Sequence, residues 1–277
     1  MLSSREQNPN GQGPSRADLA RAGFINTTRA QRLLADPALT PLLQAIPVGQ
    51  LLSDLSDSPD PDQATLALVR LCEASPKPQQ LAQDLKRSSH RRRLLALLGA
   101  SRALGDFLIA NPDSVACLDQ EFDAEKVAAT MTSRVKRALD AGSIPDAVHA
   151  LRLGYYQALC AIAAGDLTHP QPLQYMPQVG LQLSQLADAA VAAALPIAYR
   201  KAGASDQLAF CVIAMGKTGA RELNYISDVD VMYVVGGALD ETQATAVGSA
   251  VASALTDIIS GVGTLAPLWP LDAALRP

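Results

Sequence analysis

Residues 215–230 read MGKTGARELNYISDVD, and this stretch decides the fold class because it joins two strand-like segments through a glycine-bounded loop. The segment before it, Leu208 to Met215, is an uninterrupted apolar run of strand length. The segment after it, Asp228 to Val235, alternates in polarity, so Asp228 and Asp230 share one face of the predicted strand. A strand rises about 3.3 Å per residue, which places these two carboxylates roughly 6–7 Å apart.

Two like charges held this close on a half-buried sheet repel each other unless a cation lies between them. Carboxylate oxygens suit Mg²⁺, which usually shares its coordination shell with water and substrate phosphates. The pattern therefore predicts a Mg²⁺ site for phosphate transfer. Two commoner phosphate motifs are excluded. A Walker A loop requires a glycine where Cys211 stands, and the dinucleotide pattern requires a third glycine besides Gly216 and Gly219.

A glycine after one strand, followed twelve positions later by Asp-x-Asp on the next, resembles the nucleotidyltransferase superfamily that includes DNA polymerase β. The longer run from Gly216 to Asp230 resembles the glutamine synthetase adenylyltransferase family, which carries G-K-x-G-x-x-E-L-[NT]-x-x-S-D-[ILV]-D in each of two catalytic halves. Two more stretches are similar to that family. They are LLALLGASRALGDFL at 94–108, similar to a helix of its N-terminal domain, and LWPLDAALRP at 268–277, similar to its segment with a third acidic residue.

The resemblance implies a set of site residues. The catalytic residues, which also hold Mg²⁺, would be Asp228, Asp230 and Asp272. The residues that contact the nucleotide and its phosphates would be Gly216, Lys217, Arg221, Asn224 and Ser227. Asn224 resembles the adenylyl-removing half of the family more than the adenylylating half. The implied reaction is phosphorolysis, in which phosphate releases AMP from a tyrosine of adenylylated glutamine synthetase as ADP.

Family members are much longer than 277 residues, so we expect an N-terminal piece that carries the adenylyl-removing half. The whole enzyme would also adenylylate glutamine synthetase from ATP and so control nitrogen assimilation. The resemblance further points to a PII-type signalling protein as a partner. Two alternatives stay open: a nucleotidyltransferase acting on another protein or a small molecule, and a helical docking fragment that is inactive on its own.

Composition predicts a cytoplasmic enzyme that binds neither nucleic acid nor membrane. The net charge of −4 argues against a nucleic-acid binder that relies on a broad basic face. The four cysteines are far apart and form no CxxC pair, so they are expected to be buried thiols. Charged residues, prolines and glycines interrupt the apolar stretches 187–199 and 248–271, so neither is expected to span a membrane.

The predicted fold class is α+β. We expect a disordered tail over 1–21, a mostly helical domain over 22–205 and an incomplete polymerase-β-like nucleotidyltransferase core over 206–277. Apolar spacing predicts one helical run from Leu94 that ends at Asn111. The basic cluster before it, over 86–93, is expected to be solvated, with a partner-docking patch as the alternative, while His90 is expected to be structural. The last seventy residues are expected to form β-loop-β-α-β. Its helix would begin at Asp240, and its final strand would bring Asp272 beside the other two aspartates.

Overall fold

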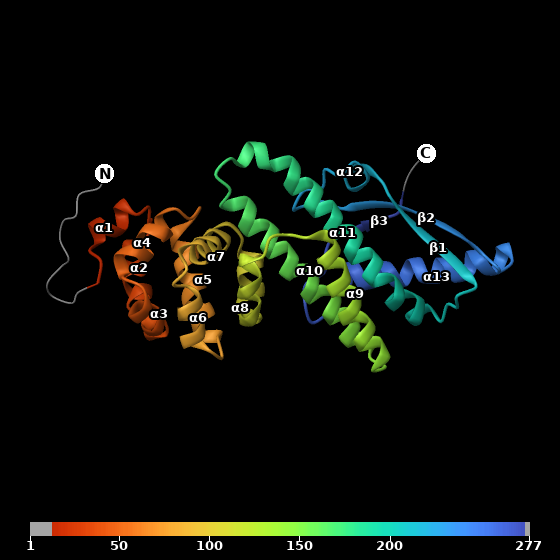
Figure 1. Ribbon diagram of the computed structural model, residues 1–277, viewed down its shortest axis with the longest axis horizontal. Coiled ribbons are helices and arrows are strands. Elements are labelled where there is room, and N and C mark those ends of the chain that lie inside the picture. Colours follow the sequence, from red (N-terminus) through yellow and green to blue (C-terminus); the bar gives the residue numbers. More distant parts are fainter. Residues whose placement is uncertain (1–12, 275–277) are drawn as a thin grey trace. The chain divides into compact units, whose positions relative to one another are not determined.

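The computed structural model describes residues 13–274 of the chain (Figure 1). Its contacts divide into two compact units, one comprising residues up to 120 with 163–168 and the other comprising 121–162 with 169 onward. Helix α10 (Ile144–Leu167) contributes to both units. This division falls near residue 120, inside the range expected to be one helical domain, and the boundary expected at residue 205 stays a prediction.

The first unit is built from short helices with leucine-rich buried faces. Helix α5 packs against both α7 and α8, and α3 packs against α6. The described elements of this unit that lie wholly within it are α1 (Arg16–Arg21), α2 (Thr27–Leu34), η1 (Pro37–Leu39), α3 (Thr40–Ala45), α4 (Val48–Ser56), α5 (Pro61–Ala74), α6 (Pro78–Asp84), α7 (Ser88–Ala100), α8 (Arg102–Ala110) and η2 (Pro112–Asp119).

The prediction of a disordered tail over residues 1–21 is wrong for the last residues of that range. Residues 16–21 form helix α1, which begins with a capping box: Ser15 accepts from the Asp18 backbone N–H, and the Asp18 carboxylate accepts from the Ser15 N–H. Leu19 of this helix is fully buried. The remainder of the expected tail, residues 1–12, lies outside the described residues.

The single helical run predicted from Leu94 to Asn111 is two helices. Ser101 separates α7 from α8 in extended backbone geometry, with φ −137° and ψ 112°, and its hydroxyl accepts from the Leu104 N–H to begin α8. A serine cap thus interrupts the chain without disturbing the apolar spacing, which is why the periodicity did not reveal the break. The predicted end at Asn111 is confirmed.

The basic residues at the start of α7 are not all solvated. Arg91 is only 1% exposed, and its Nε lies 2.5 Å from Asp54 Oδ2 while Nη1 donates to the Leu85 carbonyl. His90 is equally buried, with Nδ1 2.7 Å from Asp119 Oδ1. Lys86, Arg87 and Arg92 are exposed and fit the expectation. Two residues of the charge run therefore belong to the core of this unit, where they fix helix ends.

The second unit combines long helices with a three-stranded sheet (Figure 1). Its elements are α9 (Ala124–Asp140), α10 (Ile144–Leu167, through residue 162), α11 (Pro172–Ala202), β1 (Leu208–Ala214), α12 (Gly216–Gly219), β2 (Val229–Gly237), α13 (Glu241–Ser260) and β3 (Leu271–Asp272). The sheet order is β1-β2-β3, with β1 antiparallel and β3 parallel to β2. The α+β prediction is confirmed, as is the predicted β-loop-β-α-β order.

Helices α11 and α13 pack against each other and against one face of the sheet. On that face Val229 and Val231 are almost completely buried, and Val235 lies against Gly248 of α13. On the opposite face Met232 is 41% and Val234 47% exposed. The predicted alternation is therefore confirmed, because Val229 and Val231 face the helices and Asp230 shares the open face with Met232.

Helix α13 begins and ends where the sequence predicted. The Asp240 carboxylate accepts from the Gln243 N–H at 2.9 Å, and Gly261 follows the last turn. Helix α11 is long and apolar enough to cross a membrane by length and composition, but 67% of its most apolar window is buried against the rest of the chain. Apolar core helices pass the same test, so α11 is weak evidence for a membrane span.

The cysteines are buried at three of the four positions: Cys72, Cys117 and Cys160. The expectation of a buried thiol is wrong for Cys211, which is exposed. Cys211 lies on β1 and pairs with Val234 of β2. A cysteine in the middle of an apolar run is expected to be buried, but only one face of this strand is covered.

Candidate metal centre

The glycine loop is a single helical turn, α12, which follows β1 directly. The Met215 N–H donates to the Asp230 carbonyl at 2.8 Å, so the loop begins in register with β2. Gly216 has φ +51°, and a Cβ atom there would overlap the Asp230 carboxylate. Gly219 is equally constrained, since a Cβ would lie 2.6 Å from the Ala214 carbonyl oxygen. Both glycines of the loop are therefore required by close approach, and Gly216 lies directly against a predicted metal ligand.

Three carboxylates meet at this loop. One oxygen from each of Asp228, Asp230 and Asp272 lies within 4.8 Å of the others. This is closer than the 6–7 Å expected along a regular strand, because Asp228 precedes the first residue of β2 and the strand repeat does not fix its side chain. Asp272 arrives on β3, whose backbone pairs it with Asp230. The sequence prediction that Asp272 lies beside the other two is confirmed.

The charge of this cluster is uncompensated within the described part of the chain. No ion pair joins any of the three carboxylates to a described lysine, arginine or histidine. Asp230 is half-buried and the other two are exposed, so the oxygens remain open to a ligand. Three mutually repelling carboxylates with oxygen-only donors fit a hard divalent cation such as Mg²⁺.

Helix α10 holds the loop that delivers β3. Arg152 is 1% exposed and donates to the carbonyls of Ile258 at 2.8 Å, Gly261 at 2.7 Å and Leu265 at 2.8 Å. Burial lowers the pKa of its guanidinium. Tyr156, one helical turn further along α10, donates to the Pro267 carbonyl at 2.7 Å. A buried cation thus caps α13 and shapes the chain between that helix and Asp272.

The register of β3 is set at its first residues. The Val229 N–H donates to the Pro270 carbonyl at 2.9 Å, and the Leu271 N–H donates to Ser260 Oγ at 3.1 Å. Ser260 in turn donates to the Trp269 carbonyl at 2.9 Å. Trp269 itself is buried with its ring edge-on to Tyr155. These contacts bring Asp272 to its place opposite Asp230.

The remaining predicted site residues lie around the same loop, in different environments. Lys217 is exposed, and no ion pair to it is found among the described residues. Arg221 forms an ion pair with Asp188 of α11. Asn224 is exposed, and Ser227 donates to Asp228 Oδ1 at 3.4 Å. Their predicted contacts with nucleotide and phosphate stay predictions.

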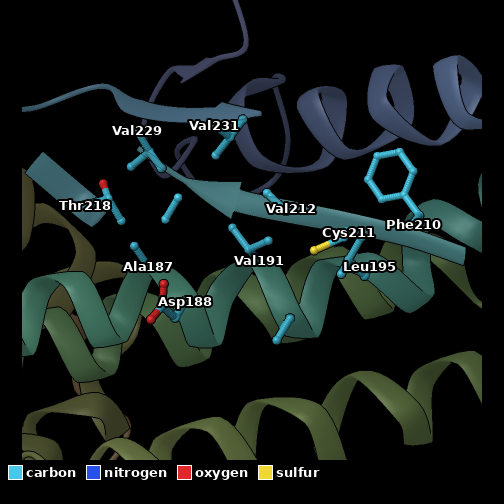
Figure 2. Close-up of a pocket in the computed structure, with 12 residues that line it drawn as sticks. Ala187, Asp188, Val191, Leu195, Phe210, Cys211, Val212, Thr218, Val229 and Val231 are labelled. Carbon is cyan, nitrogen blue, oxygen red and sulfur yellow. The ribbon is translucent and has the colours of Figure 1, made fainter. Parts of the chain in front are cut away.

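A cavity of about 370 Å³ lies beneath the loop, between α11 and the covered face of the sheet (Figure 2). Figure 2 shows Val191 and Leu195 of α11 directed toward β1, with Thr218 at one end beside Val229. The cavity has mainly apolar walls, and Asp188 and Cys211 also line it. None of Asp228, Asp230 and Asp272 lines this cavity.

A family model described as glutamate-ammonia ligase adenylyltransferase matches residues 91–277. The chain belongs to the glutamate-ammonia ligase adenylyltransferase family. The matched range includes the glycine loop and all three carboxylates. The resemblance on which the sequence prediction rested is confirmed.

Curated relatives of this adenylyltransferase family agree. The chain is 33% identical over 288 residues to a protein of Bifidobacterium longum subsp. infantis, covering 95% of the chain and 26% of the relative. It is 38% identical over 270 residues to one of Streptomyces avermitilis, covering 94% and 26%, and 37% identical over 286 residues to one of Mycobacterium avium, covering 97% and 26%. Each is named a bifunctional glutamine synthetase adenylyltransferase/adenylyl-removing enzyme. The chain spans about a quarter of the length of these relatives.

Sequence reasoning missed the contacts of α11 with the loop beside the carboxylates. Ser184 and Asp188 contact the loop from positions 39 and 33 residues away in the chain. The available signal was a row of Gly180, Ser184 and Asp188, spaced four apart on one face of a helix otherwise rich in alanine and leucine. Such a row indicates that this face of the helix contacts another part of the chain, but it does not identify which segment that is.

Proposed function

We propose that the chain carries the adenylyl-removing centre of a bifunctional glutamine synthetase adenylyltransferase, and that residues 206–277 form part of a polymerase-β-like nucleotidyltransferase core. The observation that carries the proposal is the convergence of Asp228, Asp230 and Asp272 beside the Gly216 turn in a chain of this family. The names of the relatives supply both reactions, transfer and removal. Asn224 in the loop favours removal for this segment.

The three carboxylates would hold Mg²⁺, which supplies charge neutralisation at a transferring phosphoryl group. Asp228 and Asp230 are the proposed principal ligands, and Asp272 completes the shell or activates the nucleophile. Gly216 lets the backbone approach the phosphates, because a side chain there would occupy the space of Asp230. Lys217, without an ion-pair partner among the described residues, is available to hold phosphate oxygens.

The proposed reaction is phosphorolysis of a phosphodiester. An oxygen of inorganic phosphate forms a bond to the phosphorus of the AMP group, and the bond from that phosphorus to the tyrosine oxygen breaks. The products are ADP and a tyrosine of glutamine synthetase that regains its proton. The opposite reaction, AMP transfer from ATP to the same tyrosine, uses the same in-line arrangement of attacking and leaving oxygens.

The proposed partners follow from this reaction. They are adenylylated glutamine synthetase, phosphate, ATP and ADP, together with a PII-type signalling protein as regulator. A cytoplasmic location fits a reaction whose protein substrate is a metabolic enzyme. The relatives' names mention glutamine synthetase, which supports that choice of substrate.

The test is ADP release from adenylylated glutamine synthetase in Mg²⁺ and phosphate, comparing the wild-type chain with Asp230→Asn. Asp257→Asn is a matched control, since Asp257 is an exposed aspartate of α13 outside the carboxylate cluster. ADP from the wild type and the control, but not from Asp230→Asn, supports the removal centre and its metal ligand together.

The other outcomes separate the alternatives. AMP transfer from ATP without ADP release would reassign this segment to the opposite reaction. Labelling of a different acceptor would favour another nucleotidyltransferase. Where the chain alone releases no ADP, the wild type and the same two variants are compared in a longer chain of the size of its relatives, and inactivity of the wild type there would overturn the proposal.

A further inference from the structure

One face of α11 contacts the loop between the glycine turn and the carboxylates at three successive turns. Gly180 lies so close to the loop that a Cβ there would be 3.4 Å from Glu222 Cα and 3.5 Å from the Leu223 carbonyl oxygen. Ser184 is fully buried, and its Oγ accepts from the Leu223 N–H at 3.2 Å. Asp188 forms an ion pair with Arg221. Residues four apart lie on the same side of a helix, so these three contacts form one continuous line.

The serine contact is directional. Ser184 donates its own proton to the Gly180 carbonyl at 2.9 Å, which leaves an oxygen lone pair for the Leu223 N–H. A buried backbone N–H that loses its acceptor is costly, so this bond fixes the loop backbone at Leu223. Leu223 is itself 6% exposed, which anchors the loop on the apolar side as well.

Among the non-glycine residues that the structure describes, Arg221 alone has a positive φ, at 65°. A side chain in this left-handed region is unfavourable and persists only where the surroundings impose it. Here the Arg221 N–H donates to the Thr218 carbonyl at 3.2 Å, and the next N–H, of Glu222, donates to the Lys217 carbonyl at 2.8 Å. The loop therefore reverses sharply at Arg221, and the guanidinium is brought to Asp188 at that point.

We propose that Asp188 is a positioning residue for the metal centre and acts through Arg221. The inference rests on the proposed function, because it concerns the same three carboxylates. Asp188 and Ser184 clamp residues 221–223, and this clamp sets the path of the chain into Asp228. Arg221 then serves as the anchor of the loop, and Lys217 is the cation of the loop that faces phosphate.

The connection between the clamped residues and Asp228 is short, so the clamp influences the position of the Asp228 carboxylate. Four residues separate Leu223 from Asp228, and Asp228 has no strand ladder of its own because β2 begins at Val229. Mg²⁺ requires near-ideal octahedral geometry at about 2.0–2.1 Å, so a loosened ligand binds it less well. Groups that orient metal ligands typically change metal affinity about 10–100-fold when removed.

The test is a Mg²⁺ titration of the chain by calorimetry, with the metal alone and no nucleotide or phosphate. The variants are Asp188→Asn, Arg221→Gln and the two together. The matched control is Asp257→Asn, which removes another exposed ion pair of α11, that of Lys201 with Asp257 at 2.9 Å. Circular dichroism and thermal unfolding verify that each variant is folded.

We expect Asp188→Asn and Arg221→Gln each to weaken Mg²⁺ binding about tenfold, the lower end of that range, with little further loss in the double variant. The Arg221→Gln result is decisive. If the pair influenced Mg²⁺ only through its charges, removing a cation would strengthen binding, whereas a lost anchor weakens it. Asp257→Asn should bind as the wild type does.

Two results would count against the inference in different ways. Unchanged or stronger Mg²⁺ binding by Arg221→Gln would overturn the positioning role and leave the proposed function intact. Absence of Mg²⁺ binding by the wild-type chain, with ADP release also absent in the longer chain, would overturn the proposed function and the positioning role with it.

Discussion

Replacing Gly216 by alanine tests the contact that joins the glycine loop to the metal centre. The residue has φ +51°, and a Cβ there would overlap Asp230 Oδ2 and lie 3.1 Å from its Cγ. Asp230 must therefore move its carboxylate, or the turn α12 must open. Either change separates Asp230 from the two oxygens that now lie within 4.8 Å of it.

The magnitude has two parts. Holding alanine in the left-handed region costs about 1–2 kcal/mol of folding free energy. For a domain of some 150–250 residues each kcal/mol lowers Tm by about 2–4 °C, so a fall of roughly 2–8 °C is expected. Displacing a carboxylate ligand from an ion that binds oxygens at about 2.0–2.1 Å should weaken Mg²⁺ binding at least about tenfold.

The assay is thermal unfolding of wild type and variant at a series of Mg²⁺ concentrations. Stabilisation by a ligand grows as RT ln(1 + [L]/Kd), so a tenfold weaker site needs tenfold more Mg²⁺ for the same shift. Gly236→Ala is the control, because Gly236 lies on the same strand as Asp230 with open space at its Cβ position. A Gly216→Ala variant with the wild-type Tm and the wild-type response to Mg²⁺ would refute the reasoning.

Three further predictions concern charge, packing and pH. Asp230→Asn should raise the Tm of the metal-free chain by relieving repulsion, and should abolish the rise in Tm with Mg²⁺; a lower metal-free Tm would contradict this. Arg152→Met should lower the free energy of unfolding in urea by about 3 kcal/mol or more, since three carbonyls lose a charged donor, while Arg137→Met, an exposed arginine of α9, should stay within about 0.5 kcal/mol. Burial raises the pKa of Cys72 and Cys117 to about 12 from an ordinary value of 9.0. The unfolded chain therefore loses these thiol protons at lower pH than the folded chain, so the contribution of the two buried thiols to the free energy of unfolding is complete below pH 9 and is lost as pH rises toward 12. Replacing both cysteines by alanine should make the free energy of unfolding, measured in urea, depend less on pH between 9 and 12.

The carboxylate cluster was predictable because its information is local in the sequence. Asp228 and Asp230 are two residues apart on a strand with clear alternation, and Gly216 precedes them at a fixed distance. Asp272 was chosen because residues 268–277 resemble the family's segment with a third acidic residue, and the final strand expected there would bring it beside the other two. The strand period therefore predicted the first two carboxylates, and the family resemblance predicted the third.

The supports of the cluster were not predictable in the same way. Ser184 and Arg152 act across 39 and more than 100 residues, and nothing in their neighbourhood specifies the backbone groups they bind. Arg91 shows the same difficulty in the first unit, because its partner Asp54 lies on another helix and converts a surface-like charge run into a buried pair. Hydrogen-bond partners of long side chains depend on tertiary packing, which periodicity does not encode.

Ser101 and Cys211 show two further limits. The break between α7 and α8 leaves the 3.6-residue apolar spacing intact, so the cap rather than the pattern marks it. Cys211 lies in a run that is apolar on both faces, and such a run is typical of a strand covered on both sides. Here one face is open, and the open face is the one that carries Asp230.

The two-residue strand β3 makes the order of synthesis relevant to the site. Asp228 and Asp230 leave the ribosome more than forty residues before Asp272, with the whole of α13 between them. A nascent chain at that stage offers two carboxylates and an unpaired edge on β2, the edge that Leu271 later occupies. Asp272 and β3 reach β2 in the same step. High-affinity binding of the proposed ion would therefore indicate that β3 has paired correctly with β2.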